Sequence, residues 1–298
     1  MAIQGIFPAL VTPFNADESV SLTAVRENIL LYNQTKIAGY VVLGSTGESV
    51  MLSREEGDSI LSAAKEAAAV GKILIAGTGA ESTAETIVRT RRAAALGYQF
   101  ALVKTPYYYK PVYRAETYLR HYRAVADASP IPVLLYSVPQ FTGITLETPE
   151  VVALATHPNI VGIKDSSGNI QRVGEIVAGA PQDFTVLTGG AAVIYPALAI
   201  GARGAILALA AALPEKCAEL LELVQNGRHQ EARQLQHALV VASKRIVSEN
   251  GIAGVKFAMD LRGYQGGLPR LPLLPLTEEK KQSVAALVAQ LHPAAARV

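Results

Sequence analysis

The chain between residues 133 and 165 reads VLLYSVPQFTGITLETPEVVALATHPNIVGIKD. It begins with the apolar run Val133–Tyr136 and ends with a second apolar run, Ile160–Ile163. Between them, Thr148-Pro149-Glu150 places a proline where the first turn of a helix tolerates it, because that turn needs no N–H donor there. Runs that are apolar on both faces are typical of parallel strands covered by helices. The stretch therefore predicts a strand, a helix and a second, parallel strand.

The same alternation recurs along the first two thirds of the chain. Further apolar runs that predict buried strands are Ile6–Val11, Tyr40–Leu43, Ile73–Ala76, Phe100–Lys104, Phe184–Leu187 and Ala205–Leu209. Helix signals lie between them: Ser53-Arg54-Glu55-Glu56 has the form of a capping box, and Gly97 follows a helical segment from Glu81 to Leu96. Eight such units predict an α/β fold of the (β/α)8 TIM barrel type. The rival, a doubly wound sheet, usually has fewer strands and a phosphate-binding first turn.

After the eighth run the pattern becomes entirely helical. The expected helices are Pro214–Gln225, His229–Glu249, Ile252–Leu261 and Thr277–Leu291, with a loop at Gly263–Pro275. We expect a barrel core over residues 1–212 and C-terminal helices over residues 213–298 that pack on it as a single structural unit. Lys256 and Arg262 in this tail are interpreted as surface or helix-end charges.

Composition excludes several classes of protein. Of the 298 residues, 50% are hydrophobic and 17% charged, which excludes a disordered chain. The net charge of +2, without a basic block, argues against a nucleic-acid partner. No membrane-spanning segment is expected, because no apolar run approaches about 18 residues without glycine, proline or a charge. No signal peptide is expected either, because Met1–Gly5 has no basic segment before an apolar stretch. The single cysteine, Cys217, cannot form an internal disulfide and is interpreted as a core residue. It favours a reducing, cytoplasmic compartment.

Common cofactor and metal motifs are missing from the sequence. Gly77-Thr78-Gly79 begins like a dinucleotide fingerprint, but Ser82 stands where the third glycine is required. The histidines lack metal-ligand spacing and are interpreted as surface or packing residues; they are His121, His157, His229, His237 and His292. We therefore expect neither a metal nor a cofactor.

The active site of such a barrel lies at the carboxyl ends of its strands. Gly44-Ser45-Thr46-Gly47-Glu48 follows the second strand, and its N–H groups and hydroxyls suit either one bound anion or an ordinary turn. The tyrosines 107–109 follow the fourth strand, where packing or an interface is the favoured explanation for them. Tyr136 places a phenol at the end of the fifth strand.

Lys164 is the most informative residue at these strand ends. It follows the apolar run Ile160–Ile163, and a solvated lysine is the ordinary explanation for such a position. Inside an apolar barrel, however, burial would disfavour the ammonium, lower the pKa of the lysine and free a nucleophilic amine. Such an amine forms a Schiff base with a keto acid, and the phenol of Tyr136 could carry the protons.

Three motifs in matching order resemble one known family. Gly-Ser-Thr-Gly-Glu at 44–48, Tyr-Ser-Val-Pro at 136–139 and Gly-Ile-Lys-Asp at 162–165 are similar to those of the dihydrodipicolinate synthase/N-acetylneuraminate lyase family. The resemblance covers essentially the whole chain. It implies a barrel with a helical tail, a homotetramer, and metal-free class I aldolase chemistry on pyruvate or a 2-keto acid that yields it.

The resemblance also implies roles for single residues. Lys164 matches the Schiff-base lysine, Tyr136 the catalytic tyrosine and Ser45 the relay hydroxyl. Tyr108 matches a tyrosine that a neighbouring subunit contributes to the relay. Two further matches concern the keto acid. Ser45 and Thr46 match its carboxylate clamp, and Ile206 matches a position whose carbonyl faces it.

Two departures bear on the substrate. Dihydrodipicolinate synthases carry an arginine for the carboxylate of aspartate semialdehyde where this chain has Phe141, which offers no bidentate contact. Sialic acid lyases carry acidic residues where this chain reads Thr188–Val193 without any. Residues 129–139, 157–162 and 251–256 look most like 4-hydroxy-2-oxoglutarate aldolase, which cleaves its substrate to pyruvate and glyoxylate.

The expected function is therefore a lyase, a metal-independent pyruvate aldolase that cleaves 4-hydroxy-2-oxoglutarate. The first alternative is 4-hydroxy-tetrahydrodipicolinate synthase, with the missing arginine replaced from elsewhere. Another aldolase, a dehydratase or a decarboxylase of the family is the second alternative, because an imine is an electron sink for several outcomes. A non-enzymatic keto-acid sensor is the third, and the presence of both Lys164 and Tyr136 argues against it.

Overall fold

The computed structural model describes residues 3–292 and has eight parallel strands in one sheet, ordered β1-β8-β7-β6-β5-β4-β3-β2. The strands are β1 (Gly5–Pro8), β2 (Gly39–Val42), β3 (Ile73–Gly77), β4 (Phe100–Lys104), β5 (Val133–Ser137), β6 (Ile160–Asp165), β7 (Thr185–Thr188) and β8 (Gly204–Leu207). The Ala38 N–H donates to Ile6 O at 2.9 Å, and the Leu10 N–H donates to Val41 O at 2.9 Å. These bonds join the two outer strands, β1 and β2, and the sheet forms the predicted (β/α)8 barrel.

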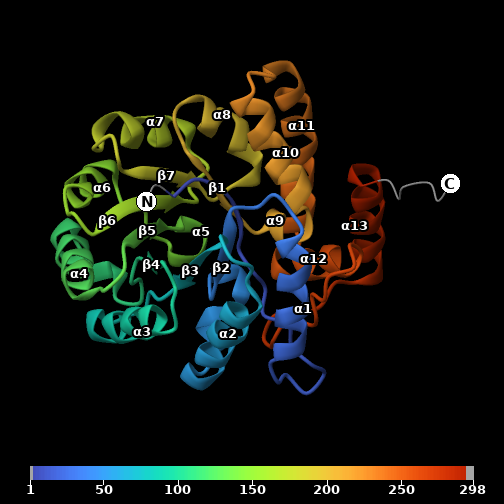
Figure 1. The fold of residues 1–298 in the computed structure, drawn as a ribbon, viewed down its shortest axis with the longest axis horizontal. Helices are drawn as coiled ribbons and strands as arrows, with labels where there is room; N and C mark the ends of the chain where they lie inside the picture. Colours follow the sequence, from blue (N-terminus) through green and yellow to red (C-terminus); the bar gives the residue numbers. More distant parts are fainter. Residues whose placement is uncertain (1–2, 293–298) are drawn as a thin grey trace.

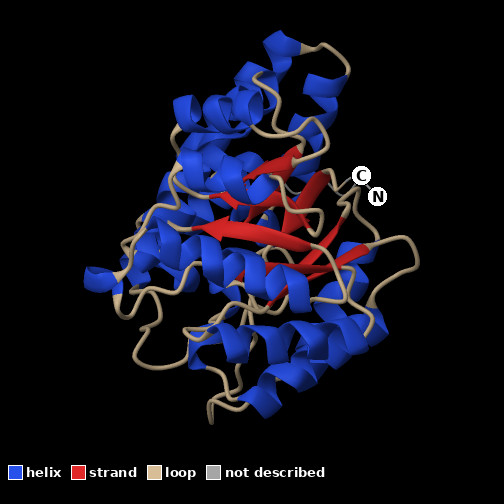
Figure 2. Cartoon of the chain, turned by 90° about the vertical axis from the view of Figure 1, so that its left-hand side faces the viewer, coloured by secondary structure: helices blue, strands red, loops and turns tan. Residues whose placement is uncertain are grey.

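Helices surround the strands, as Figure 2 shows with the red sheet inside the blue helices. The helices up to the last strand are α1 (Leu22–Asn33), α2 (Arg54–Ala67), α3 (Thr83–Ala95), α4 (Ala115–Ala128), α5 (Pro139–Thr142), α6 (Thr148–Ala155), α7 (Ile170–Gly179) and α8 (Ile194–Ala199). The predicted capping box is present: the Glu56 N–H donates to Ser53 Oγ, and the Ser53 N–H donates to the Glu56 carboxylate. Pro149 lies in the first turn of α6, as predicted.

The chain after β8 is helical, as predicted. It contains α9 (Leu209–Ala212), α10 (Pro214–Gln225), α11 (His229–Ala242), the π-helical segment η5 (Ser243–Ser248), α12 (Gly251–Asp260) and α13 (Glu278–Leu291). Figure 1 shows these orange and red helices gathered beside α1. The division proposed at residue 212 stays a prediction, and residues 293–298 lie outside the described part of the chain.

Several boundaries differ from the predicted ones. Strand β1 ends at Pro8 and β8 at Leu207, although both apolar runs continue further. After β8 the apolar residues form the buried helix α9, because hydrophobicity alone does not separate a buried strand from a buried helix. The single helix expected over His229–Glu249 contains the π-helical turn η5 at its C-terminal end.

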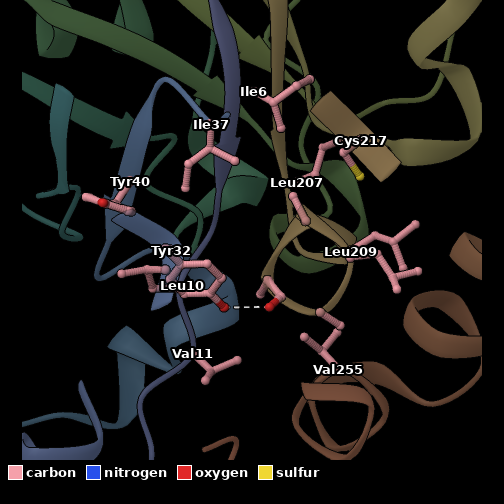
Figure 3. Packing of buried hydrophobic residues seen from close by; sticks show 14 of the residues in the cluster. Ile6, Leu10, Val11, Tyr32, Ile37, Tyr40, Leu207, Leu209, Cys217 and Val255 are labelled. Atoms are coloured by element: carbon pink, nitrogen blue, oxygen red, sulfur yellow. Dashed lines mark hydrogen bonds between the residues drawn. The ribbon is translucent and has the colours of Figure 1, made fainter. Parts of the chain in front are cut away.

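The core has an interior part and a larger part beneath the helices. Side chains from seven strands fill the barrel interior, among them Phe7, Leu134 and Ile206. A larger cluster joins the barrel to the tail helices, and Figure 3 shows Ile6 of β1, Tyr32 of α1 and Val255 of α12 in it. The Tyr32 hydroxyl donates to Ala211 O at 2.5 Å. Cys217 is fully buried here, as expected.

Candidate active site

Lys164 and Tyr136 lie opposite each other on neighbouring strands. They are register partners of β6 and β5, so their side chains leave the sheet side by side. Both are 4% exposed, and Lys164 Nζ lies 4.2 Å from the centroid of the Tyr136 ring. An amine and a phenol are thus held together at the end of the barrel where the strands terminate.

The loop after β2 brings a hydroxyl to the same place. Its residues Ser45–Gly47 form a 3-10 turn, η1, and Ser45 Oγ lies 3.4 Å from the Tyr136 hydroxyl. Either oxygen can donate in this contact. The structure therefore brings Ser45, Tyr136 and Lys164 into one continuous group, with Thr46 on the same half-buried turn.

The backbone of this loop is strained at both ends. Leu43 (φ 60°) and Glu48 (φ 55°) lie in the left-handed region, which residues with a side chain seldom adopt. A Cβ at Gly77 would lie 2.1 Å from Leu43 O, so only glycine lets β3 approach the loop so closely. Such conformations persist only where the surroundings hold them.

Asp165, the neighbour of Lys164, is committed to a different cation. Its side chain is fully buried and lies 2.8 Å from Arg172 Nε of α7. The Ser167 N–H donates to the same carboxylate at 3.0 Å. Among the described residues Lys164 has no ion pair, so its amine is not tied to a carboxylate.

Tyr108 lies apart from this group within the chain. It is 72% exposed and packs edge-on against Tyr109, with ring centroids 5.1 Å apart. The Glu81 carboxylate fixes its loop, because it accepts N–H bonds from Tyr107 at 2.9 Å and from Tyr108 at 2.8 Å. Burial lowers the pKa of the nearby Lys104, and Glu81, 3.7 Å away, partly opposes this shift.

The remaining predicted positions surround the group. Ile206 is fully buried in β8, where it pairs with Phe7 and belongs to the same interior cluster as Tyr136. Phe141 lies on the short helix α5 after β5 and is 66% exposed. Its neighbour Gln140 donates from Nε2 to Ser166 O at 2.5 Å.

The interpretation of Lys256 as a surface charge was wrong. Its side chain is 1% exposed, and Nζ lies 2.6 Å from Glu48 Oε1, at the end of the Ser45 loop. A signal was present in the sequence, because Val255, Phe257 and Ala258 surround the lysine with apolar residues. Arg262 does lie just beyond the end of α12, but it is largely covered and pairs with Glu215 at 3.3 Å.

Residues 3–292 contain neither a candidate metal site nor a helix that could span a membrane. No three or more His, Cys, Asp or Glu side chains in this range are grouped so that they could hold a metal ion. None of its helices is both long and apolar enough to span a bilayer.

Comparisons with known proteins agree with this geometry. Residues 2–291 match the model of the dihydrodipicolinate synthetase family. A 4-hydroxy-tetrahydrodipicolinate synthase of an Exiguobacterium strain is 36% identical over 97% of this chain and 98% of its own.

Solved structures of such synthases are similar to the whole fold. The structure of dihydrodipicolinate synthase from Bacillus anthracis matches this chain with a TM-score of 0.92 and 30% identity. The match covers 97% of this chain and 98% of the Bacillus anthracis chain. That of the Acinetobacter baumannii enzyme, described as complexed with pyruvate, has a TM-score of 0.90 and 32% identity, covering 96% and 98%. This chain is therefore an enzyme, a lyase acting on carbon–carbon bonds, and it belongs to the dihydrodipicolinate synthetase family.

Proposed function

We propose that the chain is a pyruvate-dependent, Schiff-base-forming aldol enzyme in which Lys164 is the nucleophile. The observation that carries the proposal is the buried amine of Lys164, without a carboxylate partner among the described residues and 4.2 Å from the Tyr136 ring. An amine held in this way attacks the keto carbon of pyruvate, and loss of water from the carbinolamine leaves the imine. Removal of a methyl proton then gives an enamine that attacks an aldehyde.

Tyr136 and Ser45 are proposed as the proton relay. The phenol would donate a proton to the departing water and accept protons in later steps, while Ser45, 3.4 Å away, extends the path toward the loop. Ser45 and Thr46 would also hold the keto-acid carboxylate through their hydroxyls and N–H groups. Ile206 would face the keto acid through its backbone carbonyl.

The second substrate distinguishes the two expected reactions. The comparisons favour the first alternative, 4-hydroxy-tetrahydrodipicolinate synthase. Two relatives of that name are 36% and 37% identical over 97% of this chain, and none of the comparisons supports a preference for 4-hydroxy-2-oxoglutarate. We therefore propose condensation of pyruvate with aspartate semialdehyde as the principal reaction. The aldolase remains a second candidate on one observation, namely that Phe141 stands where the resemblance implies an arginine.

We further propose a homotetramer in the cytoplasm. Tyr108, Tyr109 and Val112 are 72%, 63% and 69% exposed, and an apolar patch of this kind is typical of a subunit contact. A neighbour's Tyr108 could then complete the relay. The unpaired thiol of Cys217 fits a reducing compartment. Light scattering during size-exclusion chromatography would measure the oligomeric state, and a monomer with full activity would contradict the shared relay.

The decisive experiment traps the imine. Borohydride reduction in the presence of pyruvate should add one reduced adduct to Lys164, located by peptide mass spectrometry. The Lys164→Met variant should gain none, while Lys104→Met, at the end of β4 on the other side of β5, should still be labelled. Unlabelled wild-type protein would contradict the imine mechanism. Initial rates with pyruvate and aspartate semialdehyde, and with 4-hydroxy-2-oxoglutarate, then decide between the two reactions.

A further inference from the structure

Glu48 is an unusual residue at the end of the Ser45 loop. It is 1% exposed, has a left-handed backbone (φ 55°), and its N–H donates to Ser45 O at 3.1 Å, which closes the turn η1. A buried carboxylate on a strained backbone is costly unless it is fully paired. The conformation of the Ser45 loop therefore depends on what binds this carboxylate.

Both carboxylate oxygens are occupied by the C-terminal part of the chain. Lys256 Nζ of α12 lies 2.6 Å from Oε1, and the Arg270 N–H donates to Oε2 at 2.9 Å. These residues stand more than 200 positions after Glu48 in the sequence. The tail thus binds the end of the Ser45 loop at Glu48. Lys256 and Arg270 form no hydrogen bond or ion pair with Ser45, Tyr136 or Lys164.

Lys256 supports the loop by a second route as well. Its Nζ also donates to Thr12 O at 2.8 Å and to Leu268 O at 2.6 Å. The Thr12 hydroxyl in turn donates to Gly47 O of the turn η1 at 2.6 Å. The same ammonium lies 4.6 Å from the Phe14 ring centroid. The amine of Lys256 therefore links the loop after β1, the Ser45 loop and the tail.

Arg270 binds the residues that follow the Ser45 loop in the chain. Its guanidinium donates to both Glu56 oxygens, at 2.6 and 2.9 Å, and to Met51 O at 3.0 Å. Glu56 also completes the cap of α2. A Cβ at Gly266 would lie 2.2 Å from Lys256 O, so glycine is required where the tail turns back toward Arg270.

We propose that Lys256 is a positioning residue for the reaction, which it serves by holding Glu48 and thereby the distance between Ser45 and Tyr136. The proposal rests on the aldol function proposed above. Without the ammonium, the buried Glu48 carboxylate would have one partner fewer, and it would move toward water and carry the Ser45 turn with it. Because displacements of about 1 Å cost up to 10²-fold in rate, we expect kcat/KM to fall roughly 10- to 100-fold in Lys256→Met.

Two measurements on the full-length protein test this proposal. Hydrogen exchange followed by mass spectrometry should show faster exchange in residues 44–52 of Lys256→Met, where turn N–H groups are bonded in the native loop. Steady-state rates should show a higher KM for pyruvate and a lower kcat together, because Ser45 serves both the clamp and the relay. Lys280→Met, an exposed lysine on α13, should change neither.

Leu220→Ala controls for loss of stability. Leu220 is fully buried on α10, which packs against α11, α8, α9 and β1, so this variant should be destabilised with normal loop exchange and normal KM. If Lys256→Met does not fold, the double variant Glu48→Gln/Lys256→Met replaces it. It leaves no unpaired charge, and it should retain the fold with the loop defect reduced but not abolished.

The outcomes separate the two proposals. Wild-type protein without an imine would overturn the proposed function, and the exchange data would still test the role of Lys256. An active wild type with unchanged loop exchange and kcat/KM in Lys256→Met would overturn the positioning role. Equal losses in Leu220→Ala would also overturn it, because general destabilisation would then explain the effect.

Discussion

Replacing Phe141 by arginine should increase the catalytic efficiency of the enzyme with aspartate semialdehyde. Phe141 stands on α5, four residues after Ser137 of β5, at the place where the resemblance implies a carboxylate-binding arginine. Because its side chain is 66% exposed, the substitution removes little packing and should change stability by about 0.5 kcal/mol or less. Any change in rate would then report on substrate contacts.

The size of the gain follows from this exposure. A hydrogen-bonded contact with a charged partner contributes about 1.5–3 kcal/mol. At a position two-thirds exposed, solvent screening favours the lower end of this range, about 1.5 kcal/mol. Because about 1.4 kcal/mol corresponds to a factor of ten, kcat/KM for aspartate semialdehyde should rise about tenfold in Phe141→Arg.

The assay varies aspartate semialdehyde at saturating pyruvate and repeats the series with propionaldehyde, which has no carboxylate. Phe141→Lys is the matched control, since it adds a charge without the planar fork of arginine and should gain less. An unchanged rate with Phe141→Arg would mean that another group already binds the carboxylate. An equal gain with propionaldehyde would refute the reasoning altogether.

Three further predictions concern other residues. Tyr136→Phe should lower kcat by about 10²- to 10⁴-fold, measured by pyruvate consumption, because the relay loses its phenol. Burial raises the pKa of Cys217 to about 12, so iodoacetamide at neutral pH should label this thiol only in denaturant, and labelling of the folded protein would contradict its burial. Burial lowers the pKa of His121 to about 4, so only the unfolded chain takes up this proton between pH 6.5 and 4. Stability should therefore fall by about 2 kcal/mol from pH 7 to pH 5, measured by urea unfolding, and His121→Gln should lose this dependence while the exposed His237→Gln keeps it.

The barrel could be predicted because its signals are local. A run such as Phe100–Lys104 is buried on both faces, and its apolar composition records that burial directly. The pairing of Tyr136 with Lys164 followed from the same reasoning, since both end adjacent parallel strands. Boundaries were less predictable where apolar residues continue from β8 into the buried helix α9.

Contacts between distant segments left no such local signal. Glu48, Lys256 and Arg270 meet only because the barrel and its tail are both formed. The apolar neighbours of Lys256 within α12 could indicate that it is buried, but only the fold reveals a carboxylate opposite it. The strained backbone of Glu48 is equally hidden, because glycine, the usual sign of a left-handed conformation, is absent at that position.

The two buried lysines show how their partners determine what each can do. Lys256 donates to two carbonyls and faces a carboxylate at 2.6 Å, so its charge is compensated and its amine has no free position for a substrate. Lys164 is equally buried, but the neighbouring carboxylate, Asp165, is already paired with Arg172. An amine without a carboxylate partner is left free to contact a substrate. Arg172 therefore contributes to the proposed chemistry indirectly, because it pairs with Asp165, the carboxylate next to Lys164 in the chain.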